Sequence, residues 1–439
     1  MRDASDLPVC STRRSRLHCC RMIVYIAYPT SLALKSANAI QTYTTLRELR
    51  ERRPDTLAII PRWGREPSRF AEVGACHLLR PAIGKLSRLY KSTLLYYLEH
   101  SAFALMTAIL LAPQAHRIEA VYVRQVICAA WWAGVYGPLL GVPVIYEAHD
   151  LESRNPSRAK EPWAEGLLHL IDRVALTRSS AVVSLTEDFR RLLGAIGWRR
   201  AEDVFVVPDA YDERLFAPQD RGACRVALGL STDVPVIAYA GMTFAHRWLD
   251  GLVAAAASLS QNFPGLTLLL VGGRDTERDA LRHQAEGLGF VIWHGEGAAP
   301  TPGPRPILGL FGPRPQSEVL TFLGAANVLA IPDTVTDVTA SPLKLFEYLA
   351  LGQPLVLPDI PALHEIVPPQ LGHTFARRNL DSLQAALAAA LGVGDDLKGS
   401  AARRDVARDH TYGRRAERIL EVVDQVSATR TGAGLSVRI

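Results

Sequence analysis

The chain has 439 residues, of which 48% are hydrophobic and 21% charged, a balance that excludes a disordered protein and suits two α/β domains. Its formal net charge of +5 is modest for this length, and no run of lysine and arginine with interleaved aromatic residues occurs, so we expect no nucleic-acid partner. The six cysteines lack the Cys-x-x-Cys and Cys/His spacings of zinc sites. This favours reduced thiols, a cytoplasmic location and no bound metal.

Residues 1–21 differ in composition from the rest of the chain. They contain five arginines, two aspartates and three cysteines, but no apolar run. A secretory signal needs an uninterrupted apolar stretch, so we do not expect one. We interpret 1–21 as a disordered extension or a mis-assigned start, and we expect folding to begin at Met22.

Residues 22–207 alternate between short apolar runs and segments with helical spacing, which predicts a doubly wound α/β domain. The expected strands are 22–27, 56–60, 120–123, 144–147, 181–185 and 204–207. The expected helices are 39–53, 94–112, 127–140, 163–177 and 187–196. Residues 208–218 then form the linker that leaves this domain.

The segment 94–112 approaches the length of a membrane span. Glu99 and His100 lie inside it, however, and a charge there is costly in lipid, so we expect a buried helix. Four basic residues precede it, at positions Arg80, Lys85, Arg88 and Lys91. A solvated helix face explains this basic cluster most simply, and peripheral contact with anionic lipid headgroups is the alternative.

A second alternating series fills 219–410 and predicts a second doubly wound domain. The expected strands are 234–240, 266–271, 291–294, 328–331 and 355–357, with 307–311 either a further strand or part of an irregular insertion. The expected helices are 249–260, 318–325, 342–351, 380–391 and 401–410. A last helix at 411–428 and an unstructured tail at 429–439 complete the chain.

The stretch from Ser341 to Gly352 has the pattern of a capped helix that could bind a phosphate. Ser341 suits the N-cap, Pro342 the first helical position and Gly352 the residue after the last turn. Free N–H groups and the helix dipole favour an anion beside Lys344, and Glu347 could accept hydrogen bonds from a diol such as ribose. A nucleotide site and an ordinary capped helix with surface charges are both consistent with this pattern.

Polar residues follow two of the expected strands in the first domain. Ser36 and Asn38 lie in the loop after the first strand, and His149 and Asp150 end the strand at 144–147. Open parallel sheets bind their ligands at the carboxyl ends of strands, so these residues are candidates for a ligand-binding site. A plain connecting loop and a local hydrogen bond are the alternatives.

Glycines follow two of the expected strands in the second domain. Gly241 ends the strand at 234–240, and Gly272 and Gly273 end the strand at 266–271. The absence of side chains at such turns allows the backbone to approach a ligand closely.

With these landmarks in place, the chain resembles the family 4 retaining glycosyltransferases, and in particular those that build bacterial surface polysaccharides. The resemblance covers nearly everything after Met22 and is carried by 341–365, 143–150, 207–218 and 410–420. It implies a GT-B fold, in which two Rossmann-like doubly wound domains face each other across a cleft. It also implies that the last helix crosses back to the first domain.

The resemblance assigns donor-binding roles to the start of the expected helix. Glu347 matches the glutamate that holds the nucleotide ribose, and Ser341, Leu343 and Lys344 match the segment whose backbone amides meet the diphosphate. Arg247 falls where a lysine usually neutralises the leaving diphosphate, and arginine keeps that charge.

The resemblance assigns further roles and reveals two departures. His149 matches the histidine near the transferred sugar and the acceptor, and Gly241 and Gly273 match the glycine turns that face the donor. The same resemblance places three residues of the first domain on the acceptor side, namely Ser36, Asn38 and Asp150. Thr339 stands where the family has the first glutamate of a Glu-x7-Glu pair, and Met242 where a basic residue is common. These departures affect the contacts to the donor sugar and to the phosphates.

The implied activity is transfer of a sugar from a nucleotide-sugar to a saccharide or lipid-linked acceptor, with retention of configuration and without a metal or other cofactor. A cytoplasmic enzyme, peripheral at the inner face of the membrane, fits this activity. A sugar-nucleotide epimerase and a non-catalytic partner subunit of the same fold are the competing hypotheses.

Overall fold

The computed structural model describes residues 21–90, 92–154, 162–295, 298–334, 338, 341–394 and 396–435. The expected extension therefore lies outside the described residues, apart from Arg21. Strand β1 begins at Met22, the residue at which folding was expected to begin.

The first domain is built on a sheet of seven parallel strands in the order β3-β2-β1-β4-β5-β6-β7. The strands are β1 (Met22–Ile26), β2 (Leu57–Arg62), β3 (Cys76–Leu79), β4 (Ile118–Val123), β5 (Val144–Ala148), β6 (Ala181–Ser184) and β7 (Val204–Val206). The central strands are short apolar runs, as expected for parallel strands that are covered on both faces. Strand β3 was not predicted, because it lies at the sheet edge and its residues are exposed or half-buried.

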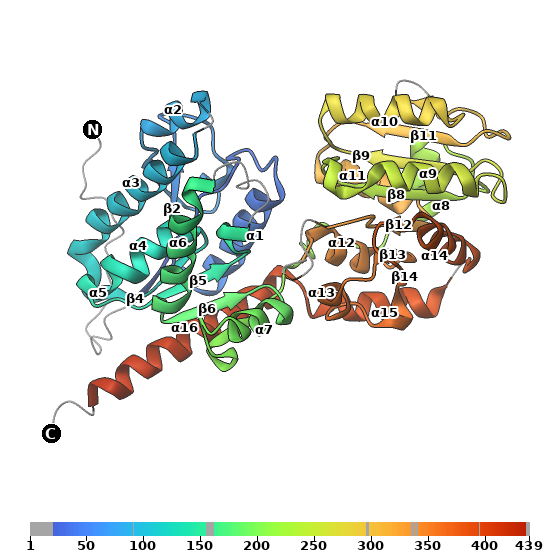
Figure 1. The fold of residues 1–439 in the computed structure, drawn as a ribbon. Coiled ribbons are helices and arrows are strands. Elements are labelled where there is room, and N and C mark those ends of the chain that lie inside the picture. The colour runs from blue at the N-terminus through green and yellow to red at the C-terminus, as the bar shows by residue number, and fades with distance from the viewer. Residues whose placement is uncertain are drawn as a thin grey trace.

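Helices cover both faces of this sheet (Figure 1). One face packs against α1 (Ala37–Arg52) and α16 (Tyr412–Leu435). The opposite face packs against α3 (Thr93–Leu111), α4 (Val126–Trp131), α6 (Glu165–Arg178) and α7 (Glu187–Ala195). The short helices α2 (Ile83–Tyr90) and α5 (Gly137–Leu140) belong to the same layer.

Helix α3 is the expected helix at 94–112, but it is buried on one face only. Thr93–Arg117 is long and apolar enough to cross a membrane by length and composition, and 44% of its most apolar window is buried in the protein. Its buried face includes Glu99, which accepts a hydrogen bond from Arg80 at 2.5 Å. Arg80, expected in a solvent-exposed basic cluster, therefore points inward, whereas Lys91 lies outside the described residues.

The second domain repeats the architecture with the strand order β10-β11-β9-β8-β12-β13-β14, again with parallel pairing. The strands are β8 (Val236–Ala240), β9 (Thr267–Val271), β10 (Val291–Trp293), β11 (Ile307–Phe311), β12 (Val328–Ala330), β13 (Leu355–Pro358) and β14 (His373–Phe375). The uncertain segment at 307–311 is thus a strand, and it lies between β10 and β9.

Two helical layers cover this second sheet. One contains α9 (Leu249–Leu259), α10 (Asp275–Gly287) and α14 (Leu380–Gly392). The other contains α8 (Arg221–Leu228), α11 (Gln316–Gly324), α12 (Leu343–Leu351), α13 (Pro361–His364) and α15 (Leu397–Arg408). Two doubly wound domains confirm the predicted fold class.

The chain crosses between the domains twice, and the two crossings pair with each other. The Tyr211 amide donates to the His410 carbonyl at 3.0 Å, and the Tyr412 amide donates to the Tyr211 carbonyl at 3.1 Å. Helix α16 then packs along the first domain and continues to Leu435. The prediction of an unstructured tail from 429 is therefore wrong as far as Leu435, because no proline interrupts the helix and extending a formed helix costs little.

A third contact between the domains lies at the start of α7. Its first amide groups, those of Glu187 and Asp188, donate to the Glu365 carboxylate of the second domain at 2.7 and 2.8 Å. The Thr186 hydroxyl donates to the Val338 carbonyl. Glu365 thus satisfies free N–H groups at a helix start across the domain boundary.

Candidate active site

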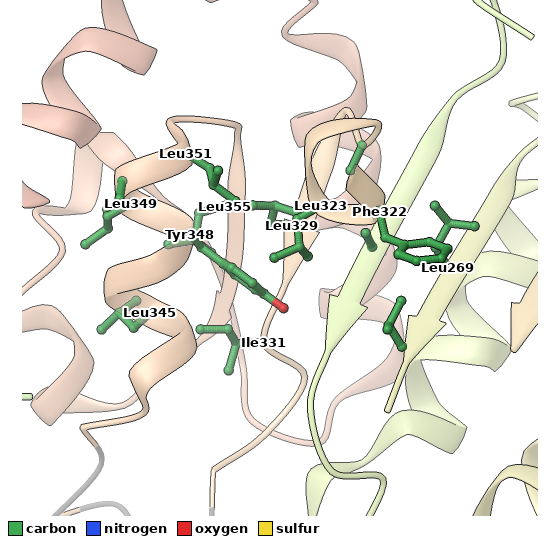
Figure 2. Close-up of a cluster of buried hydrophobic side chains, with 14 of the residues drawn as sticks. Leu269, Phe322, Leu323, Leu329, Ile331, Leu345, Tyr348, Leu349, Leu351 and Leu355 are labelled. Carbon is green, nitrogen blue, oxygen red and sulfur yellow. The ribbon is translucent and has the colours of Figure 1, made fainter. Parts of the chain in front are cut away.

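Helix α12 is held rigidly by its buried face (Figure 2). Leu345, Tyr348 and Leu349 are spaced by three and four residues and are fully buried. Tyr348 points from α12 toward Ile331, directly after β12 of the neighbouring sheet, and Leu345 and Leu349 point to the other side of the helix. The Tyr348 hydroxyl accepts a hydrogen bond from the Ala240 amide at 2.9 Å. This bond fixes the start of α12 beside the carboxyl end of β8.

The first turn of α12 has no side-chain cap. The helix begins at Leu343, Pro342 occupies the N-cap position, and Ser341 turns away. The Ser341 hydroxyl instead accepts a hydrogen bond from the Asp209 amide in the linker at 3.1 Å. The predicted cap is therefore wrong, because the linker competes for the hydroxyl. The Leu345 amide donates to the Pro342 carbonyl at 2.9 Å, and no side chain among the described residues caps the amides that precede it. Such a helix start can bind an anion.

Lys344 lies beside the carboxyl end of β8. Its Nζ donates to the Tyr239 hydroxyl at 2.8 Å and lies 3.9 Å from the centroid of the same ring. Burial, and then the positive charge of Arg247, lower the pKa of Lys344 well below its usual value, while Glu347 opposes the shift. An anion bound beside Lys344 would stabilise its charged form.

The glycine turns pack directly against this lysine. A Cβ on Gly241 would lie 2.8 Å from Lys344 Nζ, and a Cβ on Gly272 would lie 2.4 Å from the Gly241 carbonyl oxygen. Gly273, with a positive φ of 78°, would clash with the Thr243 side chain if it carried a Cβ. The structure therefore brings Gly241, Gly273 and Lys344 together at one edge of the sheet.

Arg247 ends a short 3₁₀ turn, η8 (Ala245–Arg247), in the loop after β8. Its Nε is buried and has no hydrogen-bond partner among the described residues, and the same holds for Nε2 of His246. A buried donor without a partner costs free energy. A ligand with acceptor oxygens would satisfy Arg247.

Glu347 lies on α12 beside Lys344. Burial raises the pKa of Glu347 to about 7, and Lys344 partly opposes the shift. The charges of Glu347 and Asp209, after the larger effect of burial, both raise the pKa of Tyr412. Glu347 is thus close to the point at which the chain crosses back to the first domain.

His149 lies at the carboxyl end of β5, beside a buried ion cluster. Its Nε2 is 2.8 Å from Glu147 Oε1 and 3.1 Å from Arg124 Nη2. Arg124 Nε and Arg415 Nη2 lie 2.9 and 2.8 Å from the same glutamate oxygen. Burial opposes ionisation of Glu147, but the two arginines outweigh it and hold the pKa of Glu147 well below its usual value. Because Nε2 faces this cluster, Nδ1 is the nitrogen left for a bound molecule.

Asp209 connects the two halves of the candidate site. It is buried, its Oδ1 has no partner among the described residues, and its amide binds Ser341. Burial raises the pKa of Asp209, while the charges of Arg415 and His149 oppose the shift. His149 from the first domain and Ser341 from the second therefore both interact with this one linker residue.

The other acceptor-side candidates have local partners. Ser36 caps α1 by accepting from the Ala39 amide at 3.3 Å, and Asn38 accepts from the Thr30 amide at 3.4 Å. Asp150 accepts from the Leu151 amide at 2.8 Å, and burial raises its pKa. Their acceptor-binding roles remain predictions.

Sequence reasoning missed several residues of the candidate site. Arg124 directly follows β4, so the strand-end rule that selected His149 could also have selected it. Asp333, fully buried, binds Arg377 Nε at 2.6 Å and Arg378 Nε at 2.8 Å, after β12 and β14. No local pattern indicates this second cluster, because its members are far apart in the sequence.

Of the two departures from the family pattern, the structure describes Met242 but not Thr339. Thr339 lies outside the described residues. Met242 is exposed, and its backbone carbonyl accepts from the Tyr239 hydroxyl at 2.7 Å, so only its main chain takes part in the Lys344 cluster. Within the described ranges, no three His, Cys, Asp or Glu side chains are grouped as metal ligands.

Comparison with known proteins gives a family match within the first domain. Residues 39–210 match the family described as a glycosyl transferase 4-like domain. The D-inositol 3-phosphate glycosyltransferase of Nocardia farcinica is 28% identical over 274 residues, which are 60% of this chain and 56% of that protein. The protein of the same name from Actinosynnema mirum is 32% identical over 154 residues, 33% of this chain and 37% of that protein. The chain thus spans about half or less of the length of these relatives.

Solved structures match over nearly the whole chain. HepE from Anabaena in complex with UDP has a TM-score of 0.65 at 16% identity, covering 92% of this chain and 100% of that one. The catalytic domain of starch synthase IV from Arabidopsis thaliana, bound to ADP and acarbose, has a TM-score of 0.67 at 12% identity, covering 93% and 99%. Residues 39–210 thus match a glycosyl transferase 4-like domain, and the whole chain shares the GT-B fold of these solved structures.

Proposed function

We propose that the chain transfers a sugar from a nucleotide-sugar donor to a saccharide or lipid-linked acceptor, with retention of anomeric configuration, in polysaccharide or glycoconjugate synthesis. The observation that carries this proposal is the grouping of Lys344, Arg247 and the uncapped start of α12 around the Gly241 turn. These groups can bind a diphosphate through two cations and backbone amides.

The chemistry follows from where negative charge develops. When the bond between the sugar C1 and the phosphate oxygen breaks, the electron pair leaves with the nucleoside diphosphate. Arg247, Lys344 and the α12 amides can stabilise that charge. In our proposal the acceptor hydroxyl attacks C1 from the face that the diphosphate leaves, and the departing phosphate oxygen takes the hydroxyl proton.

The remaining residues bind and orient the substrates. Glu347 accepts hydrogen bonds from the ribose hydroxyls when it is ionised. His149, whose Nε2 lies 2.8 Å from the buried Glu147 carboxylate, presents Nδ1 to the transferred sugar or the acceptor. We propose that no metal takes part, since the cations of Arg247 and Lys344 already supply charge at the diphosphate.

Support for the donor class comes from outside this chain as well. HepE was solved with UDP and glucose, and also with UDP-glucose, on the fold that this chain shares. The curated relatives are named as glycosyltransferases. A sugar-nucleotide epimerase would bind the same donor without an acceptor, and a partner subunit would not bind it at all.

A donor panel separates these alternatives. Thermal shift with nucleotide-sugars identifies the donor, and product analysis after long incubation identifies the reaction. Slow donor hydrolysis, or transfer to an added saccharide, supports a transferase. An altered sugar indicates an epimerase, and no stabilisation by any donor indicates a partner subunit. The anomeric form of the product, read by NMR, tests retention, and unchanged turnover in a chelator tests metal independence.

Two variants test the residue roles against a matched control. Glu347→Ala is expected to weaken donor binding, and Arg247→Ala to reduce mainly turnover. The control is Glu202→Ala, which removes a carboxylate that is 69% exposed, far along the chain from both. Wild-type binding and turnover in both site variants would contradict the assignment.

A further inference from the structure

The outer face of α3 is apolar along its whole length. Leu94, Leu98, Leu105 and Ile109 recur at intervals of four and seven residues and are between 46% and 65% exposed. None of the exposed or half-buried residues of α3 is charged. A solvated helix normally carries charged side chains on this face, so α3 is atypical.

Neighbouring helices extend this surface. Leu86 and Leu89 of α2 and Trp131 of α4 are also exposed. We call the apolar strip the set formed by Leu86, Leu89, Leu94, Leu98, Leu105, Ile109 and Trp131. Twelve of the nineteen large hydrophobic side chains exposed among the described residues lie on α2–α6 and the short turn Pro162–Ala164, against six in the whole second domain. Such a concentration marks an interaction surface.

Within the segment 83–117, which carries most of the strip, the exposed charges are positive. In the sequence from 83 to 117, Glu99 is the only acidic residue, and it is buried. Lys85 is exposed near one end of the strip, and His116 and Arg117 are exposed at the other. An apolar face with cations at both ends is suited to the surface of a lipid bilayer, where the apolar side chains contact acyl chains and the cations contact anionic headgroups.

From these observations we propose that the apolar strip binds the surface of an anionic phospholipid bilayer, with α3 lying in the plane of the membrane. At ~1.5 Å per residue the 19 residues of α3 would extend over roughly 28 Å of that surface. Spanning the bilayer is not compatible with its inner face, where Glu99 binds Arg80 and Tyr28 inside the domain. The proposal concerns binding only and does not depend on the proposed transferase activity.

A second copy of the chain is a poorer occupant of the strip. In a two-fold dimer the strip of one copy packs against the strip of the other. Each positive end, around Lys85 or Arg117, would then face a positive end of the other copy. Like charges placed together at an interface are repulsive. The strip also lies on the side of the first domain away from the second domain (Figure 1). Membrane binding there leaves the donor site accessible.

The proposal is tested by flotation with vesicles. The full chain is expected to float with vesicles that contain phosphatidylglycerol and to bind far less to vesicles of phosphatidylcholine alone. Leu98→Glu combined with Leu105→Glu is expected to lower binding at least about tenfold, with unchanged thermal unfolding. The matched control is Leu397→Glu, which places the same charge on an equally apolar and 81% exposed residue of the second domain, and it should bind like the wild type.

A second measurement does not depend on the double variant. Trp131, whose indole N–H donates to Ser101, should be quenched by brominated lipids, and Trp131→Phe should lose that component. Lys85→Glu with Arg117→Glu should remove the preference for anionic vesicles. Wild-type protein that stays unbound to anionic vesicles would overturn the proposal. So would a dimer in solution that the Leu98 and Leu105 changes dissociate.

Discussion

The protonation of Glu347 gives the most specific prediction for the donor site. Burial raises the pKa of Glu347 to about 7 in the ligand-free protein. About a tenth of the molecules would then carry the carboxylate at pH 6, and about nine tenths at pH 8. If the ionised form accepts the ribose hydroxyls, binding releases a proton, so affinity rises with pH. The Kd of the nucleotide-sugar is expected to be about tenfold lower at pH 8 than at pH 6, or about 1.4 kcal/mol.

The assay is isothermal titration calorimetry with the nucleotide-sugar that raises the thermal stability of the protein in the donor panel. The diphosphate diester of such a donor does not titrate in this pH range. Titrations in two buffers of different ionisation enthalpy would report the released proton. Glu347→Gln keeps the size of the side chain and removes the titration, so its affinity should not rise with pH.

Deprotonation of Lys344 changes donor affinity in the opposite direction, so the experiment must distinguish the effect of Lys344 from that of Glu347. Its pKa is lowered by burial and by Arg247, so loss of its proton at higher pH would weaken diphosphate binding. In Glu347→Gln only this effect remains, and affinity should be flat or fall with pH. If the variant shows the same rise as the wild type, the rise does not come from Glu347, and the reasoning is refuted.

Three further predictions follow from the contacts described above. Arg247→Ala should lower single-turnover rates by about 10²–10³, and Arg247→Lys should retain most of the rate; equal losses would show that charge is not the relevant property. Glu365→Ala removes the acceptor for two amide groups at the start of α7 and should increase the radius of gyration in solution scattering, which a wild-type value would contradict. Arg415→Met leaves the buried Glu147 with one cation fewer, so it should lower the free energy of unfolding, measured in urea titrations, by about 3–5 kcal/mol. The control Arg414→Met, at an exposed position, should change the free energy of unfolding by less than about 0.5 kcal/mol.

Most of the fold could be predicted because parallel strands covered on both faces are apolar throughout. Strands such as β1 and β13 are fully buried runs. The missed elements carry a weaker signal. Strand β3 is an exposed edge, and α10 buries only Leu281 and Ala285, so its sequence is polar nearly all round. The pattern of apolar residues in a sequence cannot reveal a helix or strand that buries few side chains.

The proximity of Gly241 to Lys344 was predictable for a similar reason. Gly241 follows β8 and Lys344 lies in the first turn of α12, and the strand-end rule places such ends together. The role of Ser341 was not predictable, because two acceptable partners compete for one hydroxyl. Its choice of the Asp209 amide depends on how the linker runs, and no pattern near either residue records that path.

The ion cluster beside His149 could not be read from the sequence, because it is assembled from distant segments. Arg124 and Glu147 are 23 positions apart, but Arg415 comes from the last helix, after the whole second domain. An arginine in an amphipathic helix is usually a surface residue, and only the return of α16 to the first domain buries this one.

The same arginine determines where the two domains can move relative to each other. Arg415 donates to the Val207 and Pro208 carbonyls while it pairs with Glu147, so the start of the linker is bound to the interior of the first domain. Displacing this part of the linker would break bonds to a buried charge, which costs several kcal/mol. If one domain rotates against the other, we expect the rotation to begin beyond Pro208, at Asp209, whose amide contacts Ser341 of the second domain. Asp209 also interacts electrostatically with His149. A movement at Asp209 would therefore change the surroundings of both His149 and the start of α12.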